Sequence, residues 1–90
     1  MMTGKKISRS KECAFQIIDG NAIVVQSKKR TVHWLNETAT EIWKCLEQDH
    51  SIDDLIDSIC SEFETTKDEA SADVLNFIND MLTNGLIKTI

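Results

Sequence analysis

Residues 35–46 read Leu35-Asn36-Glu37-Thr38-Ala39-Thr40-Glu41-Ile42-Trp43-Lys44-Cys45-Leu46, and the pattern of the chain changes here. Asn36 is a good N-cap, because its side chain can accept a hydrogen bond from a free backbone N–H of a first helical turn. Apolar side chains then recur with the spacing of one helical face, at Ala39, Ile42, Trp43 and Leu46. A helix is therefore predicted to begin directly after Asn36.

Three short apolar segments precede this helix, at residues 13–18, 22–26 and 30–35. Asp19-Gly20 between the first two is a strong hairpin signal, because both residue types tolerate positive φ. A polar turn at residues 27–29 leads to the third segment, whose first residues alternate between polar and apolar. These features predict a three-stranded antiparallel β-meander.

Two more helices are predicted after the first one. Ser51 with Asp54, and Thr66 with Glu69, have the spacing of capping boxes. Gly85 is suited to end the last helix in the left-handed conformation, and residues 86–90 are expected to return as a short extended segment. The predicted fold is α+β, a three-stranded antiparallel β-meander followed by three α-helices in a winged-helix-like order.

The length of 90 residues predicts one domain. Residues 1–12 are polar and basic and are expected to be a flexible N-terminal tail, with the single domain spanning residues 13–90. The tail has no apolar core of a signal peptide, and no segment approaches the roughly 20 apolar residues of a membrane span. A cytoplasmic protein without membrane contact is the expectation.

Charge divides the chain into two parts. Residues 1–35 hold seven Lys or Arg against two acidic residues, whereas residues 36–90 hold three Lys against thirteen Asp or Glu. An acidic helical part disfavours a phosphate backbone, so no nucleic-acid partner is expected. The basic part is suited to an acidic peptide or protein.

Motifs for catalysis, cofactors and metals are not found. His33 and His50 stand alone, no Gly-rich phosphate loop or metal-ligand pattern occurs, and Cys13, Cys45 and Cys60 form no C-x-x-C motif. The cysteines are interpreted as small apolar residues of the core. The sequence therefore predicts neither an enzyme nor a metal or cofactor site.

Two features point to recognition, each with a packing alternative. Trp34 and Leu35 alternate at the end of the third strand, so one of them faces away from the helices and is a candidate anchor. The last helix carries a second apolar line, Leu75, Ile78 and Leu82, beside its main one. That line is either a wide core contact or the wall of an exposed groove.

The order of motifs resembles the PqqD-like family, whose members are also known as recognition elements for precursors of ribosomally synthesised, modified peptides (RiPPs). The resemblance spans roughly residues 13–87 and rests on Leu35-Asn36-x-Thr38-Ala39-x-x-Ile42-Trp43, Ile52-x-x-Leu55-Ile56, Phe63 and Asp73-Val74-x-x-Phe77-Ile78-x-x-Met81-x-x-x-Gly85-Leu86-Ile87. The aromatic-Leu-Asn run before the first helix is most similar to stand-alone members from lasso-peptide pathways.

This resemblance implies a noncatalytic domain that holds the leader segment of a precursor peptide and delivers it to a maturation enzyme, such as a peptidase, a cyclase or a radical SAM enzyme. In the family, the leader adds as an antiparallel strand beside the third strand and inserts apolar side chains toward the last helix. The implied contact residues are Arg30, Thr31, Val32, His33, Trp34, Asp73, Val74, Leu75, Ile78, Asn79 and Leu82. The alternatives are a winged-helix DNA-binding regulator and a generic protein-interaction adaptor.

Overall fold

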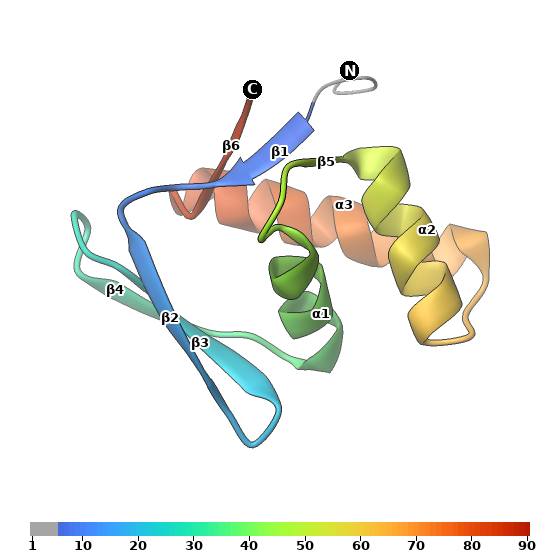
Figure 1. Ribbon diagram of the computed structural model, residues 1–90, viewed down its shortest axis with the longest axis horizontal. Helices are drawn as coiled ribbons and strands as arrows, with labels where there is room; N and C mark the ends of the chain where they lie inside the picture. The colour runs from blue at the N-terminus through green and yellow to red at the C-terminus, as the bar shows by residue number, and fades with distance from the viewer. Residues whose placement is uncertain (1–5) are drawn as a thin grey trace.

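The computed structural model describes residues 6–90, which form three helices and six strands (Figure 1). Two antiparallel three-stranded sheets are present in this part of the chain, ordered β2–β3–β4 and β5–β1–β6. The predicted α+β fold, with a meander before three helices, is confirmed. In chain order the elements are β1 (Lys6–Arg9), β2 (Cys13–Ile18), β3 (Asn21–Gln26), β4 (Thr31–Trp34), α1 (Glu37–Cys45), β5 (His50–Ser51), α2 (Ile52–Glu62), α3 (Lys67–Thr83) and β6 (Ile87–Thr89).

The meander forms where the sequence predicts it. Asp19 and Gly20 have φ values of 53° and 85°, and this pair of positive values is typical of a two-residue type I′ turn. β3 pairs with β2 on one side and with β4 on the other, with Ile23 opposite Trp34. No strand within residues 6–90 pairs with the other side of β4.

The predicted caps begin and end the helices. Asn36 accepts a hydrogen bond from the backbone N–H of Ala39 at 2.8 Å, and Ser51 forms a complete capping box with Asp54. Thr66 accepts from the backbone N–H of Glu69, but the carboxylate of Glu69 accepts from the Thr65 hydroxyl, so the second box is only half formed. Gly85 has φ of 74°, as expected for the residue that ends α3.

The tail prediction is wrong from residue 6 onward, and residues 1–5 lie outside the described residues. β1 pairs with β6 from Ile7 opposite Thr89 to Arg9 opposite Ile87, and with β5 on its other side. Ile7 is fully buried. One apolar residue in this short strand gives a weak local signal, because its partners lie at the far end of the chain.

Arg9 attaches β1 to the first helix and to the meander. Its guanidinium lies 4.6 Å from the ring centroid of Phe15 and 4.7 Å from that of Trp43. Its Nε and Nη2 both donate to the backbone carbonyl of Trp43. Burial lowers the pKa of Arg9, and the nearby Glu47 carboxylate opposes this effect. Stacking and hydrogen bonding together compensate the partial desolvation of the cation.

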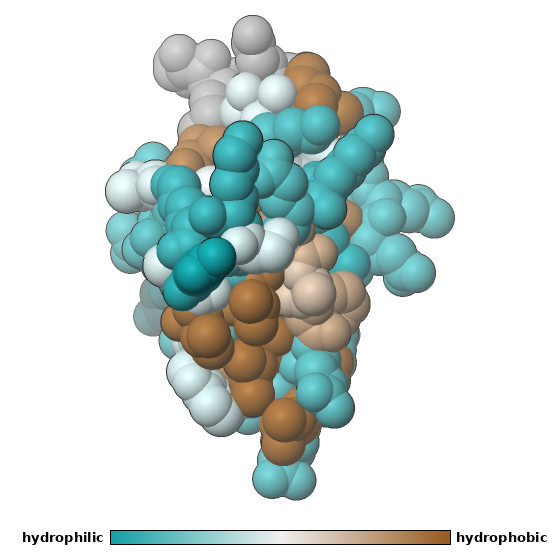
Figure 2. Space-filling view, turned by 90° about the vertical axis from the view of Figure 1, so that its left-hand side faces the viewer, coloured by the Kyte–Doolittle hydropathy of each residue, from teal (hydrophilic) through white to brown (hydrophobic). Residues whose placement is uncertain are grey.

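The core lies between the meander and the helices. Val24 faces inward to it, and β1 and β6 add Ile7 and Ile87. Cross-strand pairing places Ala14, Val25 and Val32 on the opposite side of the meander, with Ile23 beside Trp34. None of the three helices within residues 6–90 covers this outer face (Figure 1), and Figure 2 shows a contiguous apolar patch on this side of the molecule. None of the helices within residues 6–90 combines the length and apolar composition that a membrane span requires.

Candidate functional site: an open strand edge beside a cavity

One edge of β4 has no partner strand within residues 6–90 and exposes backbone groups of two residues. Leu35 N–H donates to the carbonyl of Ala22 at 2.9 Å, which shows that the backbone of Leu35 faces β3. Backbone direction alternates along an antiparallel strand, so His33 and Thr31 also face β3. The N–H and C=O groups of Val32 and Trp34 therefore point away from the sheet, at the spacing that an added strand would use.

The side chains of β4 alternate in the same way. Val32 is 57% exposed and Trp34 is 73% exposed, both on the outer face, whereas Thr31 and His33 are half-buried on the inner side. His33 Nε2 lies 3.0 Å from Thr31 Oγ1. Trp34 is thus the exposed member of the Trp34–Leu35 pair, and Leu35 belongs to the core. Arg30 precedes the strand with φ of 55°, in the turn from β3.

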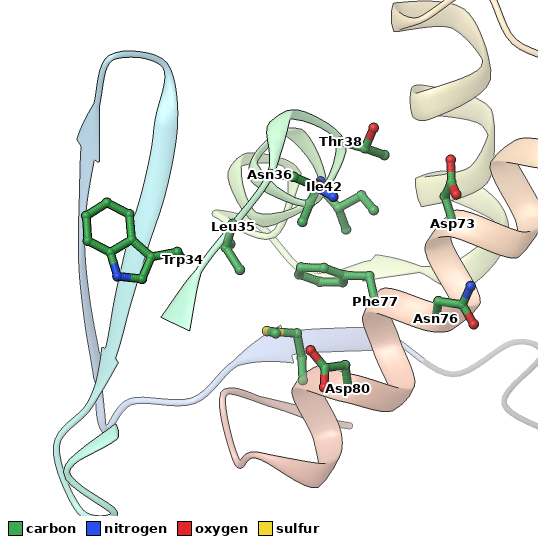
Figure 3. A pocket seen from close by; sticks show the side chains of 11 residues that line it. Trp34, Leu35, Asn36, Thr38, Ile42, Asp73, Asn76, Phe77 and Asp80 are labelled. Carbon is green, nitrogen blue, oxygen red and sulfur yellow. The ribbon is translucent and has the colours of Figure 1, made fainter. Parts of the chain in front are cut away.

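A cavity of about 440 Å³ lies between the end of β4, the start of α1 and one face of α3. Its lining consists of Trp34, Leu35, Asn36, Thr38, Ala39, Ile42, Asp73, Asn76, Phe77, Asp80 and Met81. Figure 3 shows Ile42 and Phe77 facing one another across it, while the indole of Trp34 lies on the far side of the strand. The cavity therefore has an apolar floor and a polar rim.

The α3 residues that the resemblance implied as peptide contacts lie in three different places: at the cavity, in the core and on another face of the helix. Asp73 lines the cavity, whereas Val74 and Ile78 are fully buried in the core. Leu75 and Leu82 lie about half a turn around the helix from Asp73 and do not line the cavity. Leu75 is 44% exposed, and Leu82 is half-buried against the core. Asn79 is exposed and also lies outside the cavity.

Sequence reasoning missed the residues that complete the cavity. On α3 they are Asn76, Phe77, Asp80 and Met81, and with Asp73 they recur at the spacing of one helical face. On α1 they come from the first two turns, which follow β4 after a link of two residues. This wall of the cavity could have been predicted from the polar residues Asp73, Asn76 and Asp80, which recur at helical spacing next to the apolar core face of α3.

Charges of both signs lie around the site. Lys28, Lys29 and Arg30 form a basic turn before β4, whereas Asp73 and Asp80 carry negative charge at the cavity. Lys29 Nζ lies 3.4 Å from the carbonyl of Thr83, near the C-terminal end of α3, where a cation interacts favourably with the helix dipole.

The chemistry available here is recognition through backbone pairing and apolar contact. An extended segment added to β4 could place alternate side chains over the cavity. Within the described part of the chain, no three His, Cys, Asp or Glu side chains converge as a metal site would require. The three cysteines are free and half-buried, and burial raises the pKa of the Cys13 and Cys45 thiols, which disfavours the reactive thiolate.

Two solved structures have closely similar folds. One is titled TbiB1 in complex with the TbiA(beta) leader peptide, with 20% identity, a TM-score of 0.83, and coverage of 90% of this chain and 94% of that chain. The other is titled lasso peptide synthetase B1 complexed with the leader peptide, with 22% identity, a TM-score of 0.79, and coverage of 91% and 96%. Among curated protein sequences, none is significantly similar to this chain.

The family comparison covers most of the domain. The model of the family described as coenzyme PQQ synthesis protein D (PqqD) matches residues 21–87, from the start of β3 to the start of β6. This range includes β4, α1 and α3, the three elements that surround the cavity. The chain therefore belongs to the PqqD family.

Proposed function

We propose that this chain is a noncatalytic module that captures the leader segment of a ribosomally synthesised precursor peptide. The observation that carries the proposal is the open edge of β4 beside a cavity with an apolar floor. A leader lying along this edge would pair its backbone with Val32 and Trp34. Every second side chain would then point toward α3, and one apolar side chain would occupy the cavity floor at Ile42 and Phe77.

The comparisons support this proposal in two ways. The chain shares its family with PqqD, and the two similar structures are titled as complexes with leader peptides. The contact surface in this chain then consists of the β4 edge, residues 30–34, together with Asp73 and the cavity lining. We keep Leu75, Asn79 and Leu82 as a separate hypothesis, since they belong to the other side of α3.

The bound leader would be delivered to a maturation enzyme, a peptidase, cyclase or radical SAM enzyme of a lasso-peptide or other RiPP pathway. Strand addition at the edge of β4 leaves the outer face of the meander free. That face carries Val25, Val32 and Trp34 as exposed apolar side chains and provides a surface for such an enzyme. In this proposal the protein itself binds the leader and supplies no reacting group.

A DNA-binding role is the less favoured alternative. α3 would be the reading helix of a winged-helix protein, but it carries Asp68, Glu69, Asp73 and Asp80 against Lys67. A helix in the major groove needs Arg or Lys to approach phosphates and guanine. Carboxylates on this face would instead repel the duplex.

The proposal is tested by titrating a fluorescently labelled leader peptide, taken from a precursor gene beside the gene for this protein. We expect a dissociation constant of about 1 μM or tighter, which corresponds to roughly −8 kcal/mol. A scrambled leader of the same composition is the control, and duplex DNA at low salt should not compete. Binding of DNA without binding of any leader would favour the alternative.

Amide hydrogen exchange on the same complex tests the mechanism. Leader binding should slow exchange at Val32 and Trp34, whose N–H groups lack a partner within residues 6–90 of the free protein. His33 is the internal control, because its N–H already faces β3. Protection confined to α1 and α2 would contradict strand addition.

A further inference from the structure

The basic turn is held in place by a buried side chain. Gln26 is only 4% exposed, and its Oε1 accepts from the backbone N–H of Lys28 at 2.7 Å and of Lys29 at 3.3 Å. Its Nε2 donates to the carbonyl of Gly85 at 3.0 Å. The turn is therefore fixed against the C-terminal end of α3. Lys28 and Arg30 are exposed and lie just before the first residue of β4.

The opposite charge is fixed at the cavity. Asp73 and Asp80 lie on the face of α3 that lines the cavity, with Phe77 between them along the helix. Within residues 6–90, neither carboxylate lies within salt-bridge distance of a Lys, Arg or His. Asp80 only accepts a hydrogen bond from the amide of Asn84, at 3.3 Å. The two carboxylates therefore remain available to a cation from outside the chain.

The direction in which a peptide pairs with β4 decides which of its ends meets the carboxylates and which meets the basic turn. The meander is antiparallel throughout, and antiparallel pairing is slightly more stable per residue than parallel pairing. A segment antiparallel to β4 begins near Trp34 and the cavity and ends near the basic turn.

We infer that this site selects a leader with a fixed charge order, a Lys or Arg at the N-terminal side of an apolar anchor and Asp or Glu at its C-terminal side. The basic residue would lie near Asp73, which is farther than Asp80 along α3 from the basic turn, and the acidic residues near Lys28 and Arg30. β4 spans the four residues Thr31–Trp34, so the two charged positions are separated by roughly four residues of the added strand. This inference rests on the proposed function, because it describes the ligand of the same site.

Selection from a displayed library of random twelve-residue peptides tests the inference on the chain of residues 1–90. Enriched sequences should contain a basic residue before the apolar anchor and acidic residues after it. The variant Asp73→Asn should lose only the basic preference, and Lys28→Gln/Arg30→Gln only the acidic one. Asp57→Asn, on the exposed side of α2, is the matched control and should change neither.

One enriched peptide and a twin with its charges exchanged give the quantitative measurement. The exchanged twin should bind at least about tenfold more weakly at low salt, and the difference should shrink in 0.5 M salt because charges at the surface are screened. Enrichment without charge order, or with the reverse order, overturns the inference but leaves strand capture intact. If no sequence is enriched, the proposed function itself fails.

Discussion

Val32 and His33 are neighbours on β4, but their backbone N–H groups point in opposite directions. Val32→Pro removes a donor on the open edge and leaves the pairing with β3 intact, whereas His33→Pro removes a bond within the meander. We expect Val32→Pro to fold with a melting temperature near that of the wild type and to bind the leader about tenfold more weakly or worse. His33→Pro should lower the free energy of unfolding itself.

Thermal unfolding and peptide titration on both variants distinguish these effects. Val32→Ala is the control, because it shortens the same side chain without removing the N–H. Equal loss of leader affinity in Val32→Ala and Val32→Pro would assign the effect to the side chain and contradict backbone pairing.

Asn76 and Leu75 are adjacent exposed residues of α3 that lie on different faces of the helix. Asn76 lines the cavity and Leu75 does not. Asn76→Trp should fill part of the cavity and weaken leader binding about tenfold or more, while Leu75→Trp should change affinity by less than about threefold. Both substitutions are at exposed positions, so the free energy of unfolding should change by less than about 1 kcal/mol.

Fluorescence titration and chemical denaturation measure the two quantities. The opposite ranking, in which Leu75→Trp weakens binding and Asn76→Trp does not, would move the binding surface to the side of α3 that carries Leu82. The hypothesis that Leu75, Asn79 and Leu82 contact the leader would then be favoured.

The capping box of α2 makes the stability of the protein depend on pH in the acidic range. A hydrogen bond from the backbone N–H of Ser51 lowers the pKa of Asp54, and His50 contributes in the same direction. Because the pKa is lower in the folded state, this stabilisation is present above the ordinary Asp pKa of about 3.9 and is lost as the pH falls through the folded value. Asp54→Asn should therefore lose less stability than the wild type on going from pH 5 to pH 3.

Chemical denaturation at several pH values between 3 and 7 tests this expectation, with Asp57→Asn in the middle of the same helix as the control. A parallel decline of Asp54→Asn and wild type over the whole range would show that the capping carboxylate does not contribute.

Local signals in the sequence predict most of these elements. Asp19-Gly20, Asn36, Ser51 and Gly85 each act through bonds within a few residues, and the structure confirms the turn, caps and helix end that they predict. β1 was missed because its only fully buried residue, Ile7, pairs with residues at the other end of the chain. A partner so distant in sequence leaves no periodic pattern to recognise.

The candidate site could be predicted only in part for a related reason. The open edge of β4 could be predicted, because each outer strand of a three-stranded meander has only one neighbour. The family resemblance pointed to α3 as the second part of the site. The face of α3 that lines the cavity depends on how the helix packs against α1 and β4. Periodicity in the sequence places Leu75 and Leu82 on one face of α3, but it does not show which element that face contacts.

At the scale of the whole molecule, the free edge of β4 has two possible occupants that exclude one another. A second copy of the chain could pair β4 with β4, since a bare strand accepts any extended backbone. Leader and second copy would then compete for the N–H and C=O groups of Val32 and Trp34, and mass action would link them. The apparent affinity for leader should fall as the protein concentration rises, and added leader should convert dimer to monomer in sedimentation experiments. The precursor peptide would then also protect its receptor from aggregation, because a leader bound along β4 blocks the edge-to-edge pairing of two copies with which aggregation begins.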